Sequence, residues 1–190
     1  MSLSADQAKS FEAAVAPFER QVFFTCLGMM GNSQDAQDCA QETMLKAYRS
    51  YGKFRGESKL STWLYTIASR CCLDALNKNK EIVSLEALRE KGWEKEDPAP
   101  SPYLQLEESE RKHSLRRAIS LLNSEQQQVI VLCDLQGLSY AEAAEIIDCP
   151  VGTVKSRLNR ARIALKDILT AKTELFSANE SLIDERRETL

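Results

Sequence analysis

Cations and short polar side chains crowd one stretch near the end of this 190-residue chain. No acidic residue lies between Pro150 and Lys166, although the whole chain carries a formal net charge of -3 at pH 7. Such side chains suit nucleic acid, because arginine and lysine donate to guanine, asparagine pairs with adenine, and serine binds phosphate. The residues that we expect to contact DNA are Thr153, Lys155, Ser156, Arg157, Asn159, Arg160 and Arg162.

Two helices with a sharp break between them would present these side chains. Ser139 stands three residues before Glu142, the spacing of a capping box that starts a helix. Pro150 ends that helix, and a second helix begins around residues 151 to 153. Its predicted buried arc consists of Val154, Leu158, Ala161 and Leu165. This pattern is typical of a helix-turn-helix whose second helix enters the major groove. The alternative is a solvated basic face on an ordinary bundle helix.

An acidic stripe is predicted in the first half of the chain. Asp35, Asp38 and Glu42 recur at i, i+3 and i+7, so they share one side of a helix. Carboxylates repel DNA, and in a chain that otherwise looks DNA-binding this stripe favours a basic protein partner. A solvated charged face is the alternative.

Aromatic and basic residues alternate in the segment that follows, FRGESKLSTWLYTIASRCCLDALNKNK. Trp63 and Tyr65 stand among Arg55, Lys59 and Arg70. Single-stranded nucleic acid is bound by this combination, since bases stack on rings and phosphates need cations. Packing of either ring in a core remains open as the alternative.

The overall pattern predicts an all-α fold of two small helical domains joined by a flexible acidic linker. Helical periodicity covers residues 8 to 30, 33 to 51 and 61 to 79, and it resumes from about Leu104. Between them an acidic stretch contains Pro98, Pro100 and Pro102. We therefore expect an N-terminal domain over residues 1–80, a linker over 81–112, a C-terminal helix-turn-helix domain over 113–172 and a disordered or frayed tail over 173–190.

Several classes of protein and site are disfavoured by the composition. No apolar run approaches membrane-spanning length and the N-terminus lacks the pattern of a signal peptide, so we expect a cytoplasmic protein. The six cysteines show no C-x-x-C spacing and the single histidine, His113, has no neighbouring ligand, so we expect no metal, no cofactor and free thiols, with redox sensing left open. Without a phosphate-binding glycine loop or a paired nucleophile, an enzyme is not expected.

A resemblance to a known family rests on two motif sets. The stretch LLNSEQQQVIVLCDLQGLSYAEAAEIIDCPVGTVKSRLNRARIALKDIL resembles the C-terminal promoter-reading domain of bacterial sigma factors of the extracytoplasmic-function (ECF) type. Asp148 departs from it, because the family usually has glycine in the turn. Aspartate tolerates left-handed backbone better than most residues, so we expect the turn to survive at a small cost.

The N-terminal half resembles the other conserved domain of the same family. DAQDCAQETMLKAY is similar to the stretch that docks on the clamp helices of RNA polymerase, and FRGESKLSTWLYTIASRCCLDAL to the stretch that melts and reads the downstream promoter box. By that resemblance the polymerase contacts would be Asp35, Asp38, Gln41, Glu42 and Leu45. The residues facing promoter DNA near the unwound region would be Trp63, Arg70, Asn77, Lys78 and Asn79.

The predicted function is therefore that of a sigma factor. Such a chain binds core RNA polymerase, reads the upstream (−35) box with the helix over residues 151 to 166, and opens the downstream (−10) box with its N-terminal domain. Its partners would be core RNA polymerase, promoter DNA and an anti-sigma factor, often membrane-anchored. The main alternative is a conventional helix-turn-helix regulator that binds duplex DNA alone as a symmetric dimer, and a protein-interaction adaptor is a third.

Overall fold

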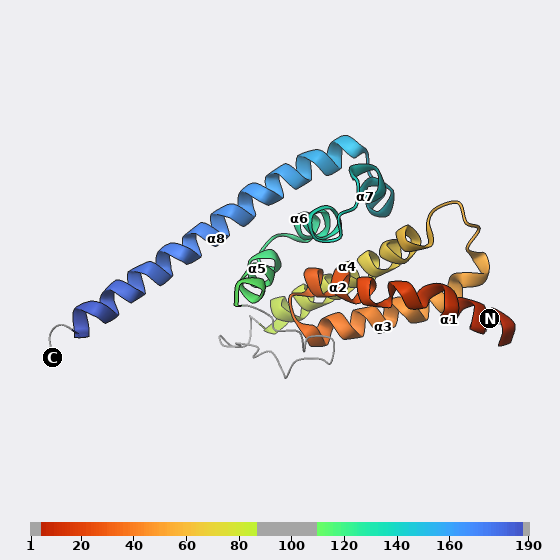
Figure 1. The fold of residues 1–190 in the computed structure, drawn as a ribbon, viewed down its shortest axis with the longest axis horizontal. Coiled ribbons are helices and arrows are strands. Elements are labelled where there is room, and N and C mark those ends of the chain that lie inside the picture. Colours follow the sequence, from red (N-terminus) through yellow and green to blue (C-terminus); the bar gives the residue numbers. More distant parts are fainter. Residues whose placement is uncertain (1–4, 87–109, 188–190) are drawn as a thin grey trace.

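The N-terminal half is a group of packed helices (Figure 1). The computed structural model describes residues 5–86 and 110–187. In this half the elements are α1 (Ala5–Val15), the 3-10 turn η1 (Ala16–Phe18), α2 (Glu19–Met30), α3 (Ser33–Ser50), the 3-10 turn η2 (Tyr51–Lys53) and α4 (Leu60–Glu86). The single helix expected over residues 8 to 30 is wrong, because Pro17 interrupts it at η1. Proline has no backbone N–H and its ring clashes with the preceding turn, so α1 and α2 are separate helices.

The turn between α2 and α3 is set by two neighbouring residues. Gly31 ends α2 in the left-handed region with φ 77°, and its N–H donates to the carbonyl of Leu27. Asn32 then caps α3, because its side-chain oxygen accepts from the N–H of Asp35 at 2.9 Å. The direction of α3, which carries the acidic stripe, follows from this cap.

In the C-terminal half, residues 110–187 form five helical elements. They are α5 (Glu110–Ser120), α6 (Ser124–Val129), the π-helix η4 (Ile130–Leu135), α7 (Tyr140–Ile147) and α8 (Val151–Arg187). The tail expected to be disordered or frayed continues α8 to Arg187. No glycine or proline follows Gly152, and leucine, alanine, glutamate and lysine are good helix formers, so nothing in the sequence stops α8 earlier.

The linker range predicted from the sequence overlaps helices at both ends. α4 continues through Glu86 and α5 begins at Glu110. Residues 87–109, on which the expectation of a flexible linker rests, lie outside the described residues.

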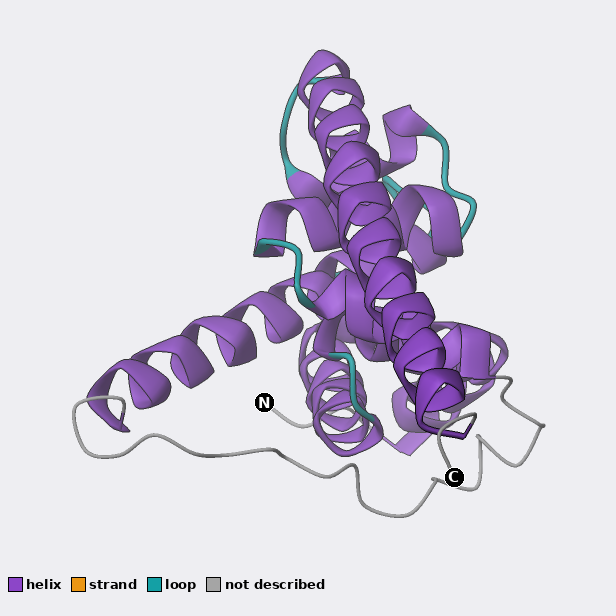
Figure 2. Cartoon of the chain, turned by 90° about the vertical axis from the view of Figure 1, so that its left-hand side faces the viewer, coloured by secondary structure: helices purple, strands orange, loops and turns teal. Residues whose placement is uncertain are grey.

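The two halves pack against each other and share one hydrophobic core. α7 and α6 lie against α4, while α5 and η4 lie against α2. Gln128 donates to the Ser69 hydroxyl at 2.6 Å across the buried contact. Figure 2 shows only helices and loops among the described residues. The tethered domains expected from the sequence are thus in direct contact.

No helix in residues 5–86 or 110–187 is both long enough and apolar enough to cross a bilayer.

Candidate nucleic-acid interface

The helix-turn-helix predicted from the sequence is confirmed in its local geometry. The Ser139 hydroxyl accepts from the N–H of Glu142 at 3.2 Å, and the Glu142 carboxylate accepts from the N–H of Ser139 at 3.0 Å. Asp148 ends α7 in the left-handed region with φ 57° and ψ 56°. The turn that the family usually makes with glycine is therefore made here by aspartate, and α8 starts three residues later at Val151.

One side of α8 is buried and the opposite side carries polar residues. Val154, Leu158 and Ala161 are at most 2% exposed, and Leu165 is half-buried, as the arc predicts. Thr153 is half-buried at the start of the helix. Four predicted contacts on this side are exposed, namely Lys155, Ser156, Asn159 and Arg160. These four side chains form a continuous surface, because they occupy i, i+1, i+4 and i+5.

Two predicted DNA contacts are held by carboxylates of the same half. Arg162 makes a two-pronged pair with Asp134, with Nη2 at 2.6 Å and Nε at 3.0 Å from its oxygens. The hydrogen bonds and charge of Asp134 raise the pKa of the Arg162 guanidinium. Arg157 pairs with Glu125 at 2.9 Å, and its side chain is 22% exposed. Sequence spacing did not reveal these partners, which lie 28 and 32 residues away.

Tyr140 adds an aromatic ring beside this surface that the sequence did not single out. It is 39% exposed, and the Lys155 ammonium lies 6.0 Å from its ring centroid. The contact is long for a cation–π interaction, so it orients Lys155 weakly.

A second candidate surface lies where η2 leads into α4. The rings of Phe54 and Trp63 lie 5.0 Å apart at 39°. They line a pocket of 310 Å³ whose other lining residues are Lys53, Arg55, Glu57 and Ser58. Two rings with nearby cations are suited to an unstacked base and its phosphate. Phe54 was not predicted, although its place as the first residue of FRGES, next to Arg55, was a usable signal.

The other predicted residues of α4 continue from Trp63 along the helix. Trp63, Arg70 and Asn77 are spaced seven residues apart, so they follow one stripe about 20 Å long. Arg70, Asn77 and Lys78 are exposed, and Asn79 belongs to α4 although its side chain lies outside the described part. Tyr65 instead belongs to the core, where its hydroxyl contacts Gln21 at 3.1 Å.

Some carboxylates of the acidic stripe on α3 are exposed, and others already interact with neighbouring side chains. Asp38 is exposed, whereas Asp35 is half-buried and accepts from the Asn32 side chain at 2.8 Å. Glu42 lies 3.7 Å from the Lys46 ammonium. Of the predicted polymerase contacts in this stripe, Asp38 is therefore the one most available to a partner.

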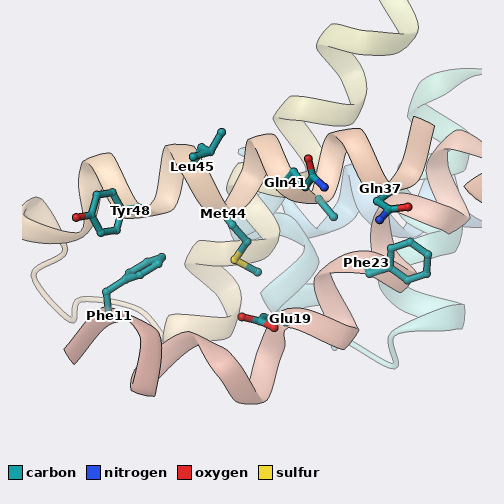
Figure 3. A pocket seen from close by; sticks show the side chains of 9 residues that line it. Phe11, Glu19, Phe23, Gln37, Gln41, Met44, Leu45 and Tyr48 are labelled. Carbon is teal, nitrogen blue, oxygen red and sulfur yellow. The ribbon is translucent and has the colours of Figure 1, made fainter. Parts of the chain in front are cut away.

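An apolar groove runs beside the stripe, between α3 and the helices that precede it. It encloses about 560 Å³, and its lining includes Gln41, Met44, Leu45 and Phe11. Figure 3 shows Met44 reaching from α3 towards the helix that carries Glu19, whereas Leu45 points away from it. Leu45 is 50% exposed and Gln41 is exposed, so both lie open beside Asp38.

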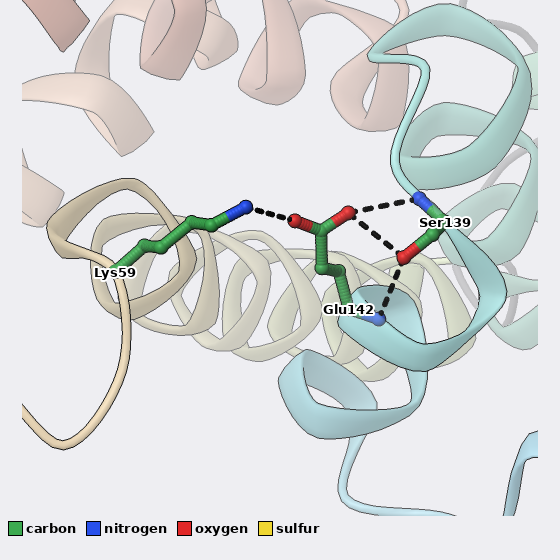
Figure 4. Close-up of polar contacts among 3 residues, drawn as sticks. All are labelled: Lys59, Ser139 and Glu142. Atoms are coloured by element: carbon green, nitrogen blue, oxygen red, sulfur yellow. Dashed lines mark hydrogen bonds and ion pairs between the residues drawn. The ribbon is translucent and has the colours of Figure 1, made fainter.

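An ion pair joins α7 to the segment just before α4 (Figure 4). The Lys59 ammonium, just before α4, donates to Glu142 of α7 at 2.8 Å. The hydrogen bond from Lys59, followed by those from Ser139, lowers the pKa of the Glu142 carboxyl to about 2. The same carboxylate thus serves the helix cap and the contact between the halves.

Comparison with known families matches both halves of the chain. The family model described as "Sigma-70 region 2" matches residues 14–82, and the one described as "Sigma-70, region 4" matches residues 112–165. The chain is 30% identical over 167 residues to the RNA polymerase sigma-H factor of Pseudomonas aeruginosa, covering 85% of this chain and 86% of that protein. It is 34% identical over 165 residues to the ECF RNA polymerase sigma-E factor of Escherichia coli K12, covering 83% and 85%.

Two solved complexes contain a chain with a similar fold. The sigma factor RpoE from Bartonella quintana, in complex with the anti-sigma factor NepR, matches with a TM-score of 0.67 and 26% identity, over 85% of this chain and 98% of that one. CnrH, in complex with the cytosolic domain of CnrY, matches with a TM-score of 0.60 over 86% and 90%. At 21% identity the second match shows the fold alone.

Proposed function

The chain belongs to the sigma-70 family of bacterial RNA polymerase factors, in its ECF group, and we propose that its two candidate surfaces take different promoter elements. As a member of that family it is not an enzyme. It directs promoter-specific initiation of transcription together with core RNA polymerase and promoter DNA. What remains to be assigned is which of its own residues perform each step.

The observation that carries the proposal is the pocket walled by Phe54 and Trp63. We assign it to one base of the downstream box, taken out of the duplex stack. Removing a base from the stack costs a few kcal/mol. Stacking on a ring returns about 1 to 3 kcal/mol per base, and Lys53 and Arg55 can neutralise the adjoining phosphates. The stripe of Arg70 and Asn77, together with Lys78 and Asn79, then guides the strand along α4.

The upstream box is assigned to the exposed side of α8. Lys155, Ser156, Asn159 and Arg160 supply donors and acceptors for base edges in the major groove. Arg157 and Arg162 are already in ion pairs with Glu125 and Asp134, so we assign them to the phosphate backbone rather than to bases. Thr153 is assigned to the phosphate backbone as well. Lysine or arginine at a phosphate fixes the helix in register without selecting sequence.

Core polymerase is assigned to α3. Asp38, Gln41 and Leu45 form an exposed acidic and apolar patch beside the groove, with Asp35 and Glu42 at its margins. A basic, partly apolar helix surface on the polymerase would complement it in charge and shape.

Two further points follow by analogy with the relatives. The Bartonella quintana factor is bound by an anti-sigma factor, and we propose that a protein of this class also holds the present chain until transcription is needed. The chain would act in the cytoplasm, where core polymerase transcribes DNA. A conventional dimeric regulator is disfavoured by the family match over residues 14–82, which such a protein does not need.

Transcription in vitro with purified core polymerase tests the pocket. Trp63→Ala and Phe54→Ala should each reduce transcription from duplex promoters about 5- to 100-fold, since one stacking partner is lost. A template melted in advance at the downstream box should restore most of the activity. Tyr65→Phe is the matched control, because it changes a buried ring of the same helix and keeps its packing. If activity falls equally on duplex and melted templates, both rings have a purely structural role. If the protein binds duplex DNA as a dimer without core polymerase, a conventional helix-turn-helix regulator is favoured instead.

A further inference from the structure

Lys59 follows directly on the loop that lines the pocket of Phe54 and Trp63. Its neighbour Ser58 belongs to the lining, and the Lys59 carbonyl accepts from the N–H of Trp63 at 3.1 Å. That hydrogen bond closes the first turn of α4, so it fixes the backbone of Lys59 relative to that of Trp63. The Lys59 ammonium is nevertheless bound by α7, in the other half of the protein.

The Glu142 carboxylate meets this ammonium as a phosphate group does. Its Oε2 is held by Ser139, because it accepts from the backbone N–H at 3.0 Å and from the hydroxyl at 2.8 Å. Its Oε1 is thereby directed at Lys59 and accepts from the ammonium at 2.8 Å. A nucleic-acid backbone offers lysine the same partner, an anionic oxygen at hydrogen-bond distance.

This ion pair is incompatible with simultaneous binding of both promoter boxes. The −35 and −10 boxes are about 25 base pairs apart, or about 85 Å of duplex at about 3.4 Å per base pair. In the structure, Lys59 contacts Glu142, and Tyr140, two residues earlier, has its ring 6.0 Å from the Lys155 ammonium. Side-chain and backbone lengths therefore put Trp63 within about 50 Å of the reader side of α8. Fitting the duplex into that span would bend it well beyond the roughly 90° that strongly bending proteins impose.

We propose that Lys59 binds a backbone phosphate of the downstream box, and that Glu142 occupies its ammonium in place of that phosphate until the two halves separate. The inference rests on the proposed function, because it takes the aromatic pocket as the site of the unstacked base. Lys59 adds a third cation to Lys53 and Arg55 beside that base. Its partner, unlike Glu57 for Arg55, comes from the other half of the protein.

The pair is suited to exchange rather than to locking the halves together. The Lys59 side chain is 74% exposed and that of Glu142 is 29% exposed. Exposed ion pairs add little stability, because water and salt screen both charges. A phosphate therefore replaces the carboxylate easily, while Glu142 keeps its hydrogen bonds to Ser139 in the cap of α7. The contact between the halves depends instead on buried groups such as Gln128 and Ser69.

The first measurement is the affinity of the holoenzyme for promoter DNA melted in advance at the downstream box, from low to high salt. Each phosphate contact on a single strand contributes about 0.7 to the slope of log affinity against log salt. Lys59→Ala should therefore reduce the slope by about 0.7 and weaken binding about 5-fold at 0.1 M salt. Lys59→Arg should retain both values. Lys112→Ala, which removes an exposed lysine of α5, should leave both unchanged.

The second measurement uses the full chain without core polymerase and a fluorescent single strand that spans the downstream box. Glu142→Gln removes the charge but keeps the capping box, because glutamine serves that position as glutamate does. The free chain should then bind the strand about 2- to 5-fold more tightly. Adding Lys59→Ala should cancel the gain. The holoenzyme, in which the halves are apart, should bind the melted promoter equally well with and without Glu142→Gln.

The two measurements can each overturn the proposal. An unchanged salt slope with Lys59→Ala would do so, as would the absence of any gain by the free Glu142→Gln chain. A gain that persists with Lys59→Ala would mean that Glu142 merely repels DNA. The proposed function fails separately, through equal effects of Trp63→Ala on duplex and melted templates. If Trp63→Ala behaves as expected and Lys59→Ala does not, only the role of Lys59 is wrong.

Discussion

Replacing Gly28 by alanine should weaken the contact between the two halves of the protein. Gly28 is buried in α2, and a Cβ there would lie 2.9 Å from Val131 Cγ2 and 3.2 Å from Leu135 Cδ1. Val131 is fully buried and β-branched, so its methyl groups have little freedom to move aside. Overpacking of this kind costs about 1 to 3 kcal/mol. The alanine regains at most about 1 kcal/mol of helix propensity, so we expect the free energy of unfolding to fall by about 1 kcal/mol.

Urea unfolding followed by far-UV circular dichroism measures this change. Gly152→Ala is the control, because a Cβ at that helical position meets nothing within 4 Å and should be neutral or stabilising. Val131→Ala removes the obstructing methyl groups. The double variant Gly28→Ala with Val131→Ala should therefore be about 1 kcal/mol more stable than the sum of the single effects predicts. The reasoning is refuted if Gly28→Ala lowers the free energy of unfolding no more than Gly152→Ala does, and if the effects of Gly28→Ala and Val131→Ala are additive. In that case the close approach of α2 and η4 does not limit packing.

Three further outcomes are expected. Asp38→Lys with Glu42→Lys should abolish co-purification with core polymerase while helical circular dichroism stays unchanged, and retained co-purification would refute the acidic contact. Arg160→Ala should cost about 1 to 3 kcal/mol at one position of the upstream box, whereas Lys166→Ala should weaken all promoters alike; identical selectivity profiles on a promoter library would contradict base contact by Arg160. Asp148→Gly should raise the free energy of urea unfolding by about 0.5 to 1 kcal/mol, because glycine adopts the left-handed backbone without strain; a decrease would mean that the aspartate side chain stabilises the turn.

Local features of the C-terminal half could be predicted from the sequence because their interactions span only a few residues. The capping box of Ser139 and Glu142 closes over three positions. The buried arc of α8 depends only on helical periodicity, and Val154 and Leu158 are buried as that arc requires. The same reasoning failed at Pro17, where the apolar period of the longer segment masked a residue that interrupts the helix.

Tertiary structure decided which of the predicted DNA-contacting side chains are free to reach DNA. Helical periodicity places Arg160 and Arg162 on the polar side of α8, yet Arg162 is held by Asp134 of η4. Trp63 stands beside Phe54 in a pocket, while Tyr65, two residues later, packs into the core. Which side chain finds a partner depends on how one helix lies across another, and short-range sequence patterns carry little information about that geometry.

By itself the sequence determined the capped turn, the buried arc and the basic face of α8, because backbone hydrogen bonds and helical period are local properties. Only the tertiary structure decided that the two halves share a core and that Gly28 lets η4 approach α2. Gly28 and Val131 are 103 residues apart in the chain, and Gln128 and Ser69, which meet in the buried contact between the halves, are 59 apart. These contacts exist because close packing in the interior selects one crossing of the helices, and that selection involves all the packed side chains at once.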